Sequence, residues 1–183
     1  MLGVNMLNPR LVVLVGIILG AAALRLIPHP FNVAPITAVA LFSGAHLSDK
    51  RLAFLIPLLA LFLSDLVLGF YPHMEVVYGS FVLVVGIGML LRERRTPLWI
   101  ACAALTSSLL FFIMTNFGVW VFGSLYPKTM AGLIECYVAA LPFFQRTLLG
   151  DAFYTAILFG GFALAQHRFP ILREPAPLKP QTA

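Results

Sequence analysis

Long apolar runs alternate with short polar turns along most of the chain. A helix that crosses the apolar core of a bilayer needs about 20 apolar residues, with about 17–25 as the usual range. Six runs have this character, at residues 11–27, 31–47, 52–70, 76–91, 98–122 and 147–165. The pattern predicts an all-α integral membrane protein, built as a bundle of six transmembrane helices.

The segment between the fifth and sixth runs departs from this pattern. Residues 129–141 have helical character and stop at Pro142, which makes them too short to span a bilayer. We expect an interfacial or re-entrant helix there, covering one mouth of the bundle. Thr147 is a suitable N-cap for the last helix, with Asp151 in its first turn, where the helix dipole favours a carboxylate.

These elements predict one membrane domain, residues 1–166. The remaining residues, 167–183, contain Pro170, Pro175, Pro177 and Pro180 and predict a disordered cytoplasmic tail.

Composition agrees with a membrane protein. The chain of 183 residues is 61% hydrophobic and 10% charged, whereas a soluble domain has about 45–50% apolar and about 25% charged residues. The formal net charge is +5, but the basic residues show no stripe with interleaved aromatic residues, so we expect no nucleic-acid partner. Basic residues in short loops suit the headgroups of membrane lipids.

The twelve Lys and Arg residues are divided unequally between the two sides of the predicted bundle. Three of them, Arg25, Lys128 and Arg146, fall on one side. The side that holds both termini has the other nine: Arg10, Lys50, Arg51, Arg92, Arg94, Arg95, Arg168, Arg173 and Lys179. The positive-inside rule therefore predicts a multi-pass membrane protein with both termini in the cytoplasm.

Most other polar residues fall near the base-poor, outer face. A proline-rich turn at residues 25–36 lies there, between the first two helices. Ionisable groups at membrane depth cost about 2.5–3.5 kcal/mol each, so they normally pair or face a wet cavity. We expect Asp65 to pair with Arg25 or Arg146, either as a structural fastener or beside a ligand cavity. The candidate substrate-binding residues are His29, Asn32, Asp65, His73, Tyr78, Asn116, Tyr126, Arg146, Asp151 and Tyr154.

Searches for catalytic and metal-binding motifs find none. The chain has no nucleophile elbow, zinc-protease motif, phosphate-binding loop or dinucleotide turn, so no catalytic residue and no enzyme activity is predicted. His29, His73 and Cys136 are not at metal-site spacing, so no metal site is predicted. Gly16 and Gly20, four residues apart on the first helix, allow close approach of a partner helix, within the bundle or in another subunit.

Several runs resemble a known family. The six-helix pattern and the sequences at residues 26–35, 63–70, 116–120, 136–144 and 148–154 resemble a largely uncharacterised bacterial membrane family. That family is similar to the substrate-binding S-components of energy-coupling-factor vitamin transporters, and to solitary cobalamin transporters among them. The resemblance implies a location in the bacterial cytoplasmic (inner) membrane.

The resemblance implies that the protein captures a vitamin at the outer face and releases it inward by toppling of the whole subunit. It implies cobalamin as one transported ligand, with no intrinsic cofactor. It also implies an energy-coupling transmembrane subunit with ATPases as partner, packed on the first helix at Gly16 and Gly20. Two alternatives remain: a membrane-embedded enzyme using the same polar residues, and a structural or assembly subunit without a ligand.

Overall fold

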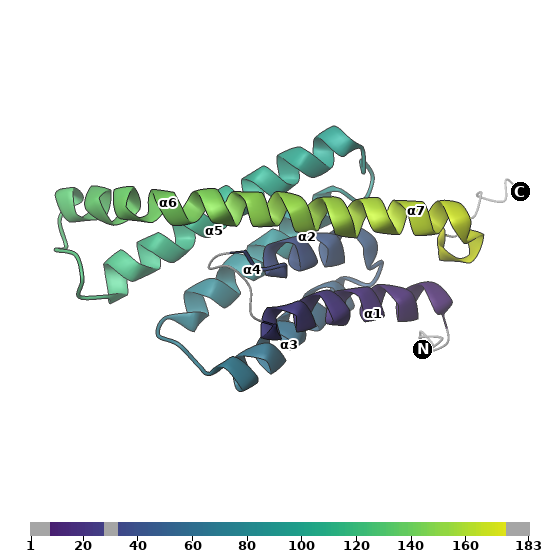
Figure 1. Ribbon diagram of the computed structural model, residues 1–183, viewed down its shortest axis with the longest axis horizontal. Coiled ribbons are helices and arrows are strands. Elements are labelled where there is room, and N and C mark those ends of the chain that lie inside the picture. Colours follow the sequence, from purple (N-terminus) through teal and green to yellow (C-terminus); the bar gives the residue numbers. More distant parts are fainter. Residues whose placement is uncertain (1–7, 28–32, 175–183) are drawn as a thin grey trace, which may run out of the picture.

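A computed structural model describes residues 8–27 and 33–174, and throughout these ranges the ordered elements are helices, with no strand. Figure 1 shows the first helix and the long last helix lying close to the horizontal long axis, with other helices packed obliquely to them. In chain order the helices are α1 (Pro9–Ala23), η1 (Leu24–Leu26), α2 (Ile36–His46), α3 (Lys50–Leu68), α4 (Met74–Leu90), α5 (Pro97–Phe122), α6 (Met130–Thr155), the π-helical turn η2 (Ala156–Gly160), α7 (Gly161–Arg168) and η3 (Pro170–Leu172).

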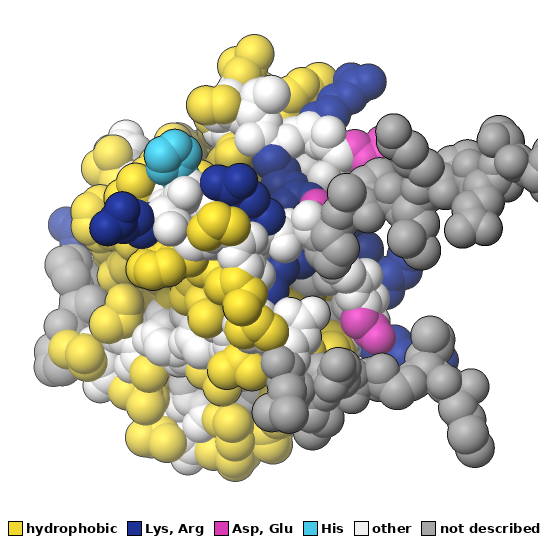
Figure 2. Space-filling model, turned by 90° about the vertical axis from the view of Figure 1, so that its right-hand side faces the viewer, with side chains coloured by type: hydrophobic (Ala, Val, Ile, Leu, Met, Phe, Trp, Pro, Cys, Tyr) yellow, Lys and Arg dark blue, Asp and Glu magenta, His cyan; other side chains and the backbone are white. Residues whose placement is uncertain are grey.

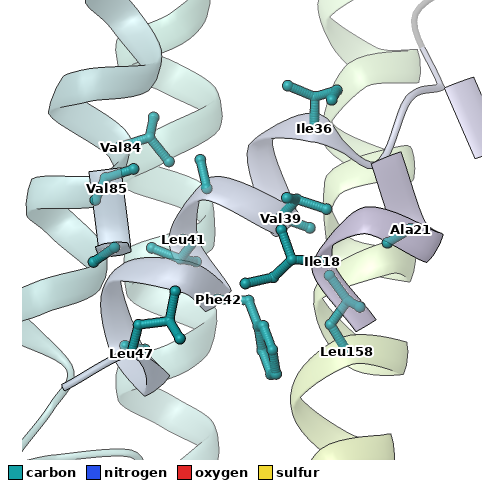
Figure 3. Close-up of a cluster of buried hydrophobic side chains, with 14 of the residues drawn as sticks. Ile18, Ala21, Ile36, Val39, Leu41, Phe42, Leu47, Val84, Val85 and Leu158 are labelled. Carbon is teal, nitrogen blue, oxygen red and sulfur yellow. The ribbon is translucent and has the colours of Figure 1, made fainter. Parts of the chain in front are cut away.

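The short helix α2 forms the centre of the bundle. All eleven of its residues are buried, as expected for a helix that is apolar on every side. Figure 3 shows Leu41 and Phe42 of α2 between Val84 and Val85 of α4 on one side and Ile18 of α1 on the other. The surrounding helices therefore pack around α2.

Two glycines bring α2 and α4 into backbone contact. A Cβ on Gly44 would lie 2.2 Å from the carbonyl oxygen of Val85, and one on Gly88 would lie 2.3 Å from that of Leu41. By contrast, a Cβ at Gly16 or Gly20 of α1 would have no neighbour within 4 Å. The small-residue contact within the described chain is therefore made by Gly44 and Gly88, and the contact expected at Gly16 and Gly20 stays a prediction.

Four segments are long and apolar enough to cross a membrane: Pro9–Leu26, Lys50–Leu68, Pro97–Phe122 and Met130–Arg168. The helices Ile36–His46 and Met74–Leu90 are also apolar but shorter. At about 1.5 Å per residue, α2 is only about 16 Å long, because it begins after Pro35 and not at residue 31 as predicted. The chain is thus all-helical and has the helices of a multi-pass membrane protein, with four of the six predicted spans at full length.

The prediction of a separate interfacial helix before the last span is wrong. Residues 130–168 form one continuous helix of α6, η2 and α7, with Pro142 in its interior. Contacts with α5 hold the helix on both sides of the proline, since the Tyr137 hydroxyl donates to the Ile113 carbonyl at 2.8 Å and the Phe144 ring packs on Phe112. Thr147 is consequently no N-cap, and its hydroxyl donates within the helix to the carbonyl of Phe143.

The boundary expected at residue 166 also differs from the structure. The last helix runs to Arg168, and the chain then folds back as η3, with Leu172 buried. Glu174 accepts hydrogen bonds from Arg10 at 2.8 Å and from Arg95 at 2.7 Å. Residues 167–174 are therefore packed against the bundle, while residues 175–183 lie outside the described ranges.

The ion pair between Arg10 and Glu174 also places both ends of the described chain at the same end of the bundle. We call this the terminal end, and the opposite end, which holds Arg25, the Arg25 end. Figure 2 looks onto the terminal end and shows Lys and Arg side chains gathered among apolar ones. The guanidinium of Arg92 donates there to the carbonyls of Gly44, Leu47 and Ser48. It thereby satisfies backbone acceptors at the C-terminus of α2.

Candidate functional site

A buried ion pair organises the Arg25 end. Asp65, in the last turn of α3, is completely buried, and its carboxylate accepts a hydrogen bond from the guanidinium of Arg25 in η1. The hydroxyl of Tyr78 in α4 donates to the other carboxylate oxygen at 2.8 Å. The same Arg25 nitrogen donates to the Ser64 hydroxyl at 2.7 Å. Three elements are thus joined through one carboxylate.

Tyr71, in the loop between α3 and α4, extends this cluster toward the bundle interior. Its hydroxyl interacts with Arg25. Burial raises the pKa of Tyr71, the nearby Asp65 carboxylate raises it further, and Arg25 opposes the shift. The phenol therefore stays protonated at physiological pH and remains available to donate a hydrogen bond.

A cavity of about 280 Å³ opens beside this cluster. We call it the polar cavity because it brings Arg25 and Tyr71 together with Asp151 of α6 and with two threonines. Its lining residues are Arg25, Ala34, Ile36, Thr37, Leu61, Tyr71, Val77, Phe81, Phe111, Thr147 and Asp151. Concave sites with an apolar wall and a few convergent polar groups are where small ligands normally bind.

Asp151 also lines the polar cavity, from a different helix than the residues of the ion pair. It is buried, accepts a hydrogen bond from the Ser108 hydroxyl of α5 at 2.7 Å and also interacts with the Thr37 hydroxyl of α2. Among the residues that the structure describes, no lysine or arginine forms an ion pair with it. The cavity therefore joins a cation that already has its counter-ion to an acid that has no counter-ion among the residues described.

The structure brings three of the predicted residues to this region: Asp65, Tyr78 and Asp151. Of the two partners predicted for Asp65, Arg25 is the one that binds it. Arg146 is instead exposed on α6 and does not line the cavity. His29 and Asn32 lie outside the described residues.

Asn116 and Tyr154 lie elsewhere in the bundle. Asn116 donates to the Phe112 carbonyl within α5 and lines a neighbouring cavity of about 240 Å³, which shares Phe111 and Thr147 with the polar cavity. Tyr154 is partly buried against the hydrophobic core.

The two remaining candidates lie in loops. His73 precedes α4 with a positive φ of 62°, stacks on Phe122 and lies 3.7 Å from the Glu75 carboxylate. Tyr126 is half-buried in the loop between α5 and α6 and does not line the polar cavity.

Five polar residues of the site were not predicted as binding residues: Thr37, Ser64, Tyr71, Ser108 and Thr147, the last of which was expected only as an N-cap. Each lies in or beside an apolar run, where a hydroxyl commonly bonds to its own helix. A signal was available for Ser64 and Tyr71, because both are close in sequence to the predicted Asp65 and His73. Thr37 and Ser108 become visible only when the packing of α2, α5 and α6 is known.

The described helices, the buried ion pair and the polar cavity together define an all-helical protein of the multi-pass membrane type, with a small polar cavity near one end. The chain belongs to the family DUF6580, described as a family of unknown function, whose model matches residues 5–172. No curated protein and no solved structure matches it. Within the described residues, no group of three or more His, Cys, Asp or Glu is placed to hold a metal ion.

Proposed function

We propose that this protein is a membrane transport protein that binds a small polar molecule in the polar cavity and passes it inward. The observation that carries the proposal is the convergence of Arg25, Tyr71 and Asp151, from three separate elements, on one cavity. Ionisable groups in the interior of a membrane protein are costly and commonly mark a substrate or ion pathway.

The residues of the cluster have two different roles: one holds Arg25 in position, and the others form the surface that binds the ligand. Asp65 is fully buried, already bonded to Arg25 and Tyr78, and absent from the cavity wall. It therefore acts as a positioning residue that holds Arg25 in place. Arg25 and Tyr71 offer donors to the ligand, and Asp151 offers an acceptor.

The charges favour a particular kind of ligand. Arg25 is neutralised by Asp65, whereas Asp151 has no basic partner among the described residues. A ligand with an ammonium or another strong donor directed at Asp151 would supply the missing counter-charge. Its acceptor group would then face Arg25 and Tyr71 across the cavity.

The size of the cavity favours a compact molecule over a corrin. Pockets for drug-sized ligands have volumes of about 300–1,000 Å³, and the polar cavity, at about 280 Å³, is at the lower limit. The cobalamin implied by the resemblance would require a much wider site. A small vitamin or an amine of similar size suits the observed volume better.

The topology that we propose keeps all six crossings, with both termini in the cytoplasm. α2 reaches only part of the way as a helix, and residues 33–35 before it and the buried Leu47 after it extend this path within the bundle. The terminal end, with its many bases, then faces the cytoplasm, and the polar cavity opens toward the outer face. An energy-coupling subunit with ATPases would pack on the exposed Gly16–Gly20 face of α1.

A thermal-shift screen in detergent tests the proposal. Small amines and vitamins are added singly to the wild type, Tyr71→Phe and Tyr137→Phe. The hydroxyl of Tyr137 donates to a backbone carbonyl and lies outside the cavity, so this variant is the matched control. A compound that stabilises the wild type and Tyr137→Phe, but Tyr71→Phe much less, supports the site. Equal shifts in all three proteins would contradict it.

A further inference from the structure

A second hollow lies on the other side of the Asp151–Ser108 contact. It is a groove of about 590 Å³ between α5 and the long helix of α6, η2 and α7, and we call it the apolar groove. Small side chains form much of its wall, including Ala104, Ala152 and Ala156. Arg95, at its end, places the mouth of the groove at the terminal end of the bundle.

The two hollows meet at a single hydrogen bond. Asp151 lines the polar cavity, Ser108 lines the apolar groove, and the Ser108 hydroxyl donates to the Asp151 carboxylate at 2.7 Å. Both side chains are buried, at 2% exposure for Asp151 and 0% for Ser108. The partition between the two hollows therefore includes this pair of side chains.

From these contacts we infer that the Asp151–Ser108 hydrogen bond is a gate between the polar cavity and the apolar groove, and that the substrate passes through it. This inference rests on the proposed function and adds the route. The ligand enters at Arg25, is held by Asp151, and leaves along the groove toward Arg95.

The Ser108 hydroxyl can leave Asp151 without losing its own hydrogen bond. The Ser108 hydroxyl has one proton and two acceptors within reach, Asp151 and the carbonyl of Ala104 at 3.0 Å. When the Ser108 hydroxyl turns to the Ala104 carbonyl, it still donates a hydrogen bond, and it releases the Asp151 carboxylate. Opening the contact therefore leaves no unpaired hydroxyl, which would otherwise cost about 1–3 kcal/mol.

Thr155 provides a polar group on the groove side. It lies one helical turn after Asp151 and lines the groove. Its side chain is buried, with 5% exposure, and its hydroxyl has no hydrogen-bond partner among the described residues. The π-helical turn η2 begins directly after it. Such turns occur often at functional sites, and a shift in this one would change the position of Thr155 relative to Asp151.

Solute permeation through proteoliposomes tests the gate without knowledge of the natural ligand. Glycerol influx is followed by stopped-flow light scattering for the wild type, the double variant Ser108→Ala/Asp151→Ala and the control Ser107→Ala. Ser107 is also a buried serine of α5, but it lines neither hollow. We expect the double variant to pass glycerol several-fold faster than the wild type and Ser107→Ala to match the wild type.

Folding of each variant is checked by size exclusion and by its helical circular dichroism. If the double variant fails to fold, Asp151→Ser is measured in its place, with a smaller increase expected. A folded variant of either kind that passes glycerol at the wild-type rate overturns the gate. If the variant passes glycerol faster but the thermal-shift screen finds no ligand for the wild type, the proposed function is rejected and the passage between the two hollows is retained. If the screen finds a ligand but the variant does not pass glycerol faster, only the passage is rejected.

Discussion

The two ends of the bundle use arginine in opposite ways. At the terminal end, Arg92 donates to three backbone carbonyls around the C-terminus of α2. At the Arg25 end, Arg25 donates to two side chains, Ser64 and Asp65, beside a cavity. The first arrangement completes secondary structure, and the second fixes a charged side chain at a binding surface. The role of each arginine in this protein therefore depends on which groups accept its hydrogen bonds.

The largest expected effect comes from removing the centre of the Arg25 cluster. Asp65→Ala leaves Arg25 without its counter-ion and Tyr78 without its acceptor. Breaking a buried ion pair by removal of one partner costs about 3–5 kcal/mol. Reversible unfolding in mixed detergent micelles measures the loss. The matched control Asp49→Ala removes an exposed N-cap of α3 and should cost only about 1 kcal/mol, so equal losses would contradict the role of Asp65.

A second prediction concerns the close contact between α2 and α4 at Gly44 and Gly88, in the centre of the bundle. In Gly88→Ala the new methyl group would meet the Leu41 carbonyl at 2.3 Å, and the backbone there cannot move away without separating α2 from α4. Overpacking of this kind costs about 1–3 kcal/mol. In Gly86→Ala, on the same helix, the methyl group would meet nothing within 4 Å. The same unfolding assay should show a loss for Gly88→Ala and almost none for Gly86→Ala.

Substitution of the arginine at each end should affect a different property: stability at the terminal end and ligand binding at the Arg25 end. Arg92→Ala removes three charged hydrogen bonds from the end of α2, and we expect a loss of about 2 kcal/mol in unfolding free energy. Since Arg92 is remote from the polar cavity, the folded variant should bind ligand as the wild type does. Arg25→Ala should lose binding at a temperature where both variants are folded. Loss of binding in Arg92→Ala alone would reverse the assignment of the two ends.

The smallest effect is expected at the exposed part of the terminal end. Glu174 bridges Arg10 and Arg95, whose side chains are 7% and 21% exposed, with a carboxylate side chain that is 44% exposed. Solvent screens this carboxylate and glutamine keeps one hydrogen-bond acceptor, so we expect the loss to lie near the upper end of the range for surface pairs, about 1 kcal/mol. Glu174→Gln should therefore lower the unfolding free energy by no more than this amount, with Glu93→Gln as an exposed control. Limited proteolysis after Arg173 should nevertheless become faster, because the carboxylate holds this segment on the bundle. An unchanged cleavage rate would show that the remaining contacts of the segment, among them the buried Leu172 side chain and the hydrogen bonds of Arg173 to the last helix, hold it without the carboxylate.

Much of the fold follows from the sequence. The apolar runs place α1, α3, α4 and α5 within a few residues of their observed ends, because length and hydropathy decide membrane helices. For the last helix they place only the C-terminal end, since the helix begins at Met130 and not at residue 147. The failures lie at Pro142 and at the C-terminal segment. Local rules end a helix at a proline, whereas packing on α5 carries α6 through it.

The candidate site follows from the sequence only in part. Asp65 and Arg25 are visible because charges in apolar runs are rare and require partners. Asp151 was predicted for its place near a helix start, yet it lies in the middle of a long helix, facing Ser108 and Thr37. Which hydroxyl faces which acid depends on how α2, α5 and α6 pack, and hydrophobic periodicity does not contain that information.

The central claim is that Asp151 and Tyr71 form a ligand site at the Arg25 end. Native mass spectrometry of protein purified gently from its own membrane tests this most directly, with wild type, Asp151→Asn and Asp49→Asn compared side by side. We expect one small bound species in the wild type and in Asp49→Asn that is lost from Asp151→Asn. Equal occupancy in all three proteins, or no bound species in the wild type, would contradict it.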